Sequence, residues 1–162
     1  MSDLGLQATA IQIIITGLAN YGVAYSYQPA PRGNAYSTFI EKFVVTISGK
    51  VQIRAWTVAY NGETREDRTV AIGATKVLRR INWLVRFFQS WDDTSEADFR
   101  DLIELAVNAI DSNRSLGGTA LDHTSCSVTL PNQGQGVMLG DYGCHLGEIR
   151  FSALVEETLT SS

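Results

Sequence analysis

The segment 79–91, RRINWLVRFFQSW, is the part of the sequence that most constrains the fold. Apolar side chains occupy both of its faces: Ile81, Trp83, Val85 and Phe87 on one, Leu84 and Phe88 on the other. A strand that is apolar on both faces belongs inside a sheet covered on both sides, because exposing either face would forfeit the free energy of burial. The segment therefore predicts a central strand.

Residues 4–19 have a helical period. Spacings of three and four residues predict one buried stripe, which consists of Leu4, Ala8, Ile11, Ile15 and Leu18. Ser2 and Asp3 can cap this helix. The run 13–15, three isoleucines, makes a second side apolar and leaves a short buried strand as the alternative. If the segment is a helix, its surplus apolar face indicates a second packing partner, such as another subunit.

Residues 94–113 predict the second helix, capped by Thr94 or Ser95 and acidic in its first turn. Its buried stripe is expected to be Phe99, Leu102, Ile103, Ala106 and Ile110. The helix should end near Asn113. Gly117 and Gly118 then supply backbone with positive φ, which lets Leu116 fold back onto the core.

Most of the remaining chain has the pattern of strands and turns. Residues 20–35 are expected to form a loop. Segments 39–48 and 51–60 predict a hairpin with its turn at Gly49–Lys50, and Asn61–Gly62 predicts a further turn before the charged, exposed ETREDR segment. In the last third, CSVTL and GVML predict short strands on either side of the PNQGQG turn. CHLGEIRFSALVEE predicts a long strand that buries Ile149, Phe151, Ala153 and Val155.

This order of elements predicts an α+β fold: a mainly antiparallel or mixed β-sheet packed by two α-helices, with an extended β-hairpin. The length of 162 residues suits a single domain over 1–162. Within it, loop 20–35 and the hairpin or connection 48–76 are expected to be excursions.

Composition narrows the classes of function. A net charge of −4 argues against a dedicated nucleic-acid binder, although it suits a surface past which DNA slides. Two cysteines are too few for a disulfide framework. With neither a visible signal peptide nor an apolar run of membrane-spanning length, a soluble protein of a reducing compartment is expected, without contact to a membrane.

The residues that could carry chemistry do not converge. His123, Cys126, Cys144 and His145 are the soft-ligand types, but Cys144 and His145 are neighbours on a predicted strand and should point to opposite faces. Neither cysteine lies at a predicted helix N-terminus, and there is no G-x-S-x-G motif. The sequence therefore predicts no catalytic residue, no bound metal and no enzyme.

Three further groups have ordinary structural explanations. The carboxylates Asp92, Asp93, Glu96 and Asp98 suit the start of a helix. The glycines 134, 136 and 140 miss the spacing of a phosphate-binding loop, so no cofactor is expected. Arg79, Arg80 and Arg86 are expected to pair at a sheet edge or interface rather than to bind nucleic acid.

Two passages together resemble a known family. TSEADFRDLIELAVNAIDSNRSLGG is similar to the helix and turn of tail terminator proteins, the head–tail joining proteins of long-tailed bacteriophages. RINWLVRFFQSWDD resembles the strand that enters this helix, and GCHLGEIRFSALVEE resembles the final strand with its acidic end. The resemblance covers roughly residues 80–157. Residues 1–79 match only in the order of their elements.

The resemblance implies a structural virion protein of the tail and neck, assembled in the cytoplasm of the host bacterium. It implies a hexameric ring that caps the tail tube, ends its polymerisation and joins the tail to the head connector, while DNA passes through the lumen without specific binding. Its partners would be its own copies, the tail tube protein and the connector or adaptor protein. At the subunit surfaces, we expect Arg114 to pair with an acidic group of a neighbour. Glu63, Glu66 and Asp67 should face a neighbour or the tube.

Other classes of protein remain as alternatives. One is a different phage ring component, such as a head-completion adaptor or the tail tube protein, and the tube protein would polymerise openly. Another is a small α+β enzyme or ligand-binding domain, which would need a convergent polar pocket. A third is a monomeric α+β module of bacterial origin.

Overall fold

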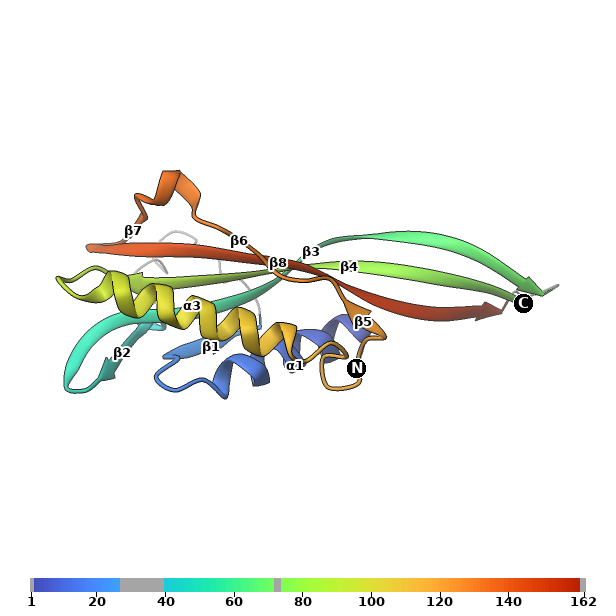
Figure 1. The fold of residues 1–162 in the computed structure, drawn as a ribbon, viewed down its shortest axis with the longest axis horizontal. Coiled ribbons are helices and arrows are strands. Elements are labelled where there is room, and N and C mark those ends of the chain that lie inside the picture. Colours follow the sequence, from blue (N-terminus) through green and yellow to red (C-terminus); the bar gives the residue numbers. More distant parts are fainter. Residues whose placement is uncertain (1, 27–39, 72–73, 161–162) are drawn as a thin grey trace.

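A computed structural model describes residues 2–26, 40–71 and 74–160 and shows the predicted α+β fold (Figure 1). Two α-helices, α1 (Asp3–Thr16) and α3 (Ser95–Asp111), pack on a mixed sheet. The strands are β1 (Val23–Tyr25), β2 (Val44–Ile47), β3 (Lys50–Ala71), β4 (Ala74–Ser90), β5 (Asp122–His123), β6 (Ser127–Thr129), β7 (Val137–Leu139) and β8 (Tyr142–Thr160), and η2 (Pro131–Gly134) is a 3₁₀ turn.

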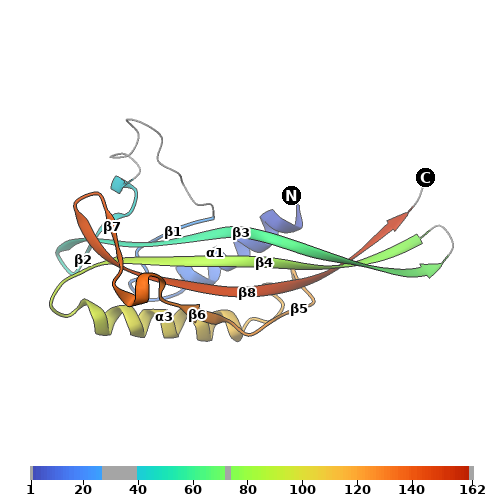
Figure 2. The ribbon, with the colours of Figure 1, turned by 90° about the horizontal axis from the view of Figure 1, so that it is seen from above.

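Three long antiparallel strands, β3, β4 and β8, form the frame of the sheet (Figure 2). The order is β1-β3-β4-β8-β5, with β1 parallel to β3. The short strands β2, β6 and β7 add to the outer edges of β3 and β8. The segment 79–91 supplies most of β4, which lies between the other two long strands, so the predicted central strand is confirmed.

In the body of the molecule both faces of the sheet are buried, as the two-sided pattern of β4 predicts. One face packs against both helices, and Trp56, Phe87 and Phe99 stack there with ring centroids 4.1 and 5.4 Å apart. The opposite face is a smaller core around Phe43 and Phe88. The predicted stripes of β4, α3 and β8 all belong to the larger core.

The first segment is a helix and not the alternative strand. The Ser2 hydroxyl accepts a hydrogen bond from the Gly5 backbone N–H at 3.2 Å and so begins α1. Burying Ile11 and Ile15 leaves the far side of the helix exposed, where 42% of Leu6 and 64% of Ile13 are accessible. The surplus apolar face predicted from the isoleucine run is therefore a real surface of the chain.

The chain after α3 returns to the core as predicted. The helix ends at Asp111, and Leu116 is fully buried against the larger core. Gly117 and Gly118 both have positive φ, 68° and 88°, which only glycine adopts without strain. The polar and glycine residues after α3 thus return an apolar side chain to the core.

Several predicted boundaries are wrong. The β2–β3 turn is Ser48–Gly49, both with positive φ, one residue earlier than predicted. Residues 40–41 are helical, so β2 begins only at residue 44. Part of the predicted 20–35 loop is strand β1, and residues 27–35 lie outside the described part of the chain.

The largest correction concerns Asn61–Gly62, which is a β-bulge inside β3 and not a turn. The register passes from Tyr60↔Trp83 to Glu63↔Ile81, so two residues of β3 face one residue of β4. Gly62 has φ +87°, a backbone conformation that turns and bulges both use. β3 consequently continues without a turn to Ala71, and the hairpin is longer than predicted. The first part of the segment 48–76, which was expected to leave the domain, pairs within the sheet of the body.

Gly22 is expected to be the glycine least tolerant of substitution. An added Cβ there would lie 2.0 Å from the Arg54 carbonyl oxygen, at a φ of +95°. We expect Gly22→Ala to lower the free energy of unfolding by about 2–3 kcal/mol in urea titrations. Gly62→Ala is the matched control, because its φ is similar but nothing lies within 4 Å of the added Cβ. Its expected cost is about 1 kcal/mol, and equal losses would contradict the steric argument.

Candidate assembly interface

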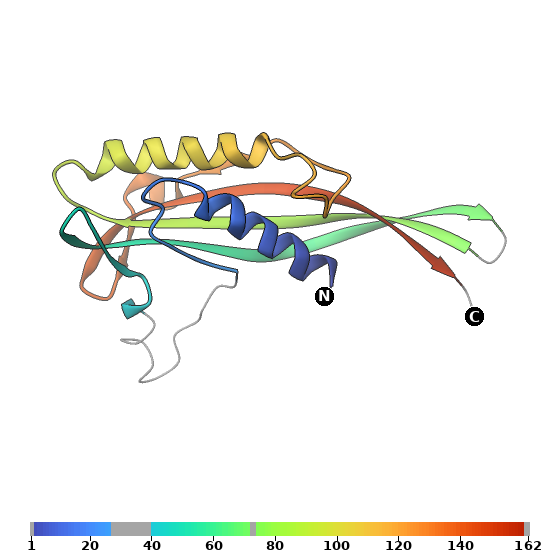
Figure 3. The same cartoon turned by 90° about the horizontal axis from the view of Figure 1, so that it is seen from below.

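The most unusual feature of the fold is an arm made of the outer halves of the three long strands. We call residues 63–71, 74–81 and 153–160 the β-arm. Figures 1 and 3 show these strands extending past both helices, at the end of the molecule that holds the C-terminus. At its base Ile81 and Ala153 still belong to the larger core, but farther out no helix of the described residues covers either face of the arm. A sheet without a covering helix has little apolar burial of its own, so such an arm suits contact with another molecule.

The three acidic residues predicted at an interface all lie on the β-arm, but they do not form one patch. Alternation along β3 places Glu63 and Asp67 on the face that continues from the larger core, and Glu66 on the opposite face. Glu66 and Asp67 are exposed, whereas Glu63 is largely enclosed. Whether these residues contact a neighbour stays a prediction.

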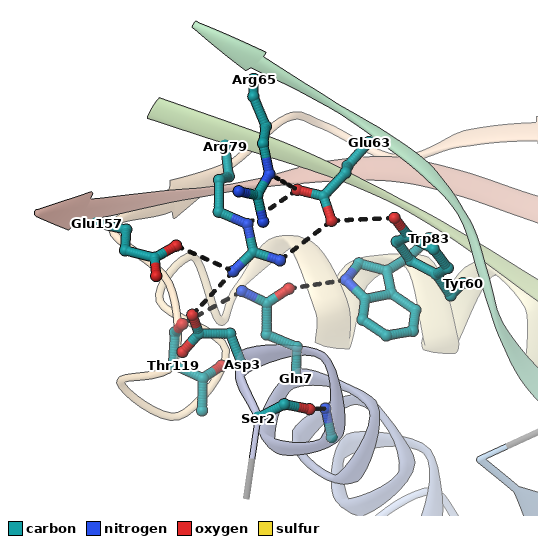
Figure 4. A network of polar contacts seen from close by, with 11 residues as sticks. Ser2, Asp3, Gln7, Tyr60, Glu63, Arg65, Arg79, Trp83, Thr119 and Glu157 are labelled. Atoms are coloured by element: carbon teal, nitrogen blue, oxygen red, sulfur yellow. Dashed lines mark hydrogen bonds and ion pairs between the residues drawn. The ribbon is translucent and has the colours of Figure 1, made fainter. Parts of the chain in front are cut away.

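Glu63 belongs to an ion-pair network where the β-arm joins the body (Figure 4). The guanidinium of Arg79 binds its carboxylate at two points, with Nε–Oε2 at 2.8 Å and Nη2–Oε1 at 3.1 Å. Arg79 Nη1 also donates to Asp3 Oδ2 at 3.0 Å and lies 3.8 Å from Glu157 Oε2. Only 8% of the Arg79 side chain is exposed, so this cation relies on its carboxylate partners.

A neutral pair extends the network into the body. The fully buried Gln7 of α1 accepts a hydrogen bond from Trp83 Nε1 at 2.8 Å and donates one to the Thr119 carbonyl oxygen at 3.2 Å. Together, Arg79 and Gln7 connect α1 to all three long strands and to the loop after α3 (Figure 4). These contacts fix the direction in which the β-arm leaves the body.

Arg79, Arg80 and Arg86 were predicted from the sequence to form ion pairs at a sheet edge or interface rather than to bind nucleic acid. Arg79 and Arg86 do pair within the sheet, Arg86 with Glu148 at 2.9 Å. Asp3 was not predicted as a partner of Arg79, because a place at the start of the first helix explained it sufficiently. Only the packing of α1 on the sheet, which local patterns do not fix, brings Asp3 beside Arg79.

Hydrogen bonds from Arg79 lower the pKa of the Glu63 carboxyl from 4.5 to about 2. A carboxyl with a depressed folded-state pKa contributes stability that is complete above its unfolded pKa and is lost as the pH falls through the folded value. We therefore expect Glu63→Gln to flatten the decline in unfolding free energy between pH 4.5 and 2, measured by urea titration at each pH. Asp92, whose pKa also lies at about 2 through its contact with Lys50, supplies a remaining slope.

Glu66→Gln is the control for this pH series. Glu66 is an exposed arm residue with no ion pair among the described residues. Its substitution should leave the pH dependence of the wild-type chain in place. Equal slopes for Glu63→Gln and the wild type would contradict the assignment of the acid-labile stability to Glu63.

Arg114 has partners within its own chain. Its guanidinium donates to the His123 carbonyl oxygen at 2.6 Å and to Ser125 Oγ at 3.1 Å, across the loop that follows α3. The residue is nevertheless exposed. Its predicted pairing with an acidic group of a neighbour stays a prediction, and a charge reversal at this position would also disturb the loop.

The soft-ligand residues are dispersed, and the described part of the chain contains no cluster of three potential metal ligands. Cys144 belongs to the smaller core, while the next residue, His145, stacks on Phe99 on the other face, as strand alternation predicts. Burial raises the pKa of Cys144 to about 12, which keeps it a thiol. His123 is buried with both ring nitrogens beside backbone carbonyl oxygens.

Ser95 and His145 look superficially like a nucleophile and its base, but the hydrogen bonds run the wrong way. Trp91 Nε1–H can only donate, and it donates to His145 Nδ1 at 3.1 Å. The proton of the neutral imidazole is then on Nε2, which faces Ser95 Oγ at 2.8 Å. The imidazole therefore cannot accept the Ser95 proton, and the buried Ser95 hydroxyl instead accepts from the Asp92 backbone N–H at the start of α3.

Comparison of the sequence with models of known protein families and with curated proteins finds no match. None of the helices in the described ranges is long and apolar enough to cross a membrane.

Proposed function

We propose that this chain is a structural virion protein, a tail terminator whose copies form a closed ring, with six as the expected number. The ring would cap the tail tube, end its polymerisation and join the tail to the head connector. The protein would act by binding neighbouring proteins through complementary surfaces and not by catalysing a reaction. The support is the resemblance of residues 80–157 to that family and the shape of the chain that contains them.

The β-arm is the observation that carries this proposal. Beyond Thr57 the outer edge of β3 has no strand partner among the described residues, and the same holds for β8 beyond Leu154. Open strand edges present unpaired backbone donors and acceptors, which natural monomers normally cover. A long arm with two open edges is explained if neighbouring copies or the tube cover it in the assembly.

The charge distribution of the arm suits contact with protein better than a grip on DNA. Its charged side chains include both signs, such as Arg65, Glu66, Asp67 and Lys76, without a basic stripe. The net charge of −4 would repel phosphates and lets DNA pass through a lumen without being held. In this proposal DNA accordingly passes through the lumen of the ring without being bound as a ligand.

Light scattering after size exclusion, combined with negative-stain imaging, tests the proposal. The expected result is a discrete ring with a central hole, and purified tail tubes should stop elongating when the ring is added. An open polymer would instead favour the tail tube protein. A stable monomer at micromolar concentration would overturn the proposal. A ring that leaves tube growth unchanged would overturn the terminator role while retaining ring assembly.

A further inference from the structure

A groove runs along α3 between this helix and the segment that carries β6 and η2. One part of it, about 320 Å³, lies between α3 and the two residues Val128 and Leu130, and only apolar atoms contribute to its exposed lining. The α3 stripe consists of Phe99, Ile103 and Val107. A second part, about 290 Å³, shares Phe99 and Leu130 and continues toward Trp91 and His145. The groove is thus a continuous trough beside a helix.

The outer side of α1 is the complementary surface. Leu6, Thr9, Ile13 and Thr16 form its exposed stripe, opposite the buried side of the helix. From Leu4 to Thr16 the helix contains no charged residue. A helix that is apolar on more than its core-facing side is typical of one buried on both sides.

We infer that the α1 helix of a neighbouring copy docks in the α3 groove of this chain. The dimensions agree: Leu6 and Ile13 are seven residues apart, about 10.5 Å along a helix, and the groove spans Phe99 to Val107, about 12 Å. The surface chemistry agrees as well. Arg100 and Glu104 also line the groove, but only apolar atoms contribute to its exposed lining, and the docking helix brings no charged side chain to it.

A chain cannot fill its own groove, because its α1 packs over β1 and β3 and against one side of α3, whereas the groove lies beyond α3 at β6. The contact between copies therefore joins two different surfaces. Such heterologous contacts build rings when the rotation closes. This inference rests on the proposed ring and identifies one of its interfaces.

Cysteine cross-linking tests the contact. In a Cys126→Ala background, Ile13→Cys and Leu130→Cys are combined and treated with a short bis-maleimide, while Cys144 stays buried. The expected result is a ladder of covalent oligomers up to the size of the ring. Each single variant should give no ladder, because one subunit must supply position 13 and its neighbour position 130. Dimers from Ile13→Cys alone would show α1 against α1 and overturn the inference.

Ile13→Asp provides the second test, since 64% of this side chain is exposed and its replacement leaves the monomer core intact. The protein concentration needed for assembly is expected to rise at least 10-fold, while the circular dichroism spectrum stays unchanged. Val51→Asp is the matched control and should assemble normally, because Val51 is 61% exposed and shares with Ile53 the sheet face opposite both helices. If Ile13→Asp still forms rings and the double cysteine variant does not cross-link, the inference is overturned but the proposed function is not. A wild-type chain that never assembles overturns both.

Discussion

Shortening the β-arm is expected to give a folded monomer that no longer forms a ring. In this variant residues 66–78 are replaced by Asn-Gly and the chain ends after Glu157. Arg65 and Arg79 face each other in the β3–β4 register, so a two-residue turn can join them without shifting the strands. Both cores and the Arg79 network remain, and we expect a cooperative unfolding transition close to that of the wild type.

The reason for the lost assembly is that the shortened arm lacks residues 66–71 of the open β3 edge and the charged side chains of Glu66, Asp67 and Lys76. Light scattering and negative-stain imaging should show single subunits at concentrations where the wild type forms rings. A chain with the same C-terminal truncation and an intact hairpin is the control and should still assemble. Rings of unchanged size from the shortened variant would contradict a role of the β-arm in assembly.

The elements that were predictable are those whose signal is local. The two-sided pattern of β4, the stripe of α3 and the Leu116–Gly117–Gly118 return are each encoded by residues a few positions apart. They do not depend on a distant partner. For the same reason the α+β class follows from the order of these elements, and the structure shows it.

The length of the β-arm and the ion pairs at its base could not be predicted from such local patterns. Asn61–Gly62 has the chemistry of a turn, and only pairing with β4 decides that the strand continues through a bulge. Likewise, Asp3 and Arg79 are 76 positions apart in the chain, and nothing local indicates that they meet. For the candidate interface, the sequence placed Glu63, Glu66 and Asp67 on one hairpin but did not show that they lie on its two different faces.

Replacing Arg79 by methionine is expected to be among the most destabilising substitutions of a charged residue in this chain. Methionine keeps much of the aliphatic packing but leaves the largely enclosed Glu63 without its two-point partner, and Asp3 and Glu157 lose theirs. Removing one member of a buried ion pair costs about 3–5 kcal/mol, and we expect the lower end, about 3 kcal/mol, because Tyr60 and Arg65 still bind Glu63. For a domain of this size that corresponds to a fall in Tm of roughly 10 °C.

Arg80→Met is the matched control, because Arg80 is the next residue on the same strand, is exposed and has no ion pair among the described residues. Its effect should stay within about 0.5 kcal/mol. A double variant, Arg79→Met with Glu63→Met, should recover much of the lost stability, since replacing both partners of a buried pair removes the unpaired charge. If Arg79→Met and Arg80→Met unfold alike by differential scanning calorimetry, the network at the arm root contributes no stability. The arm's direction must then be set by backbone pairing alone.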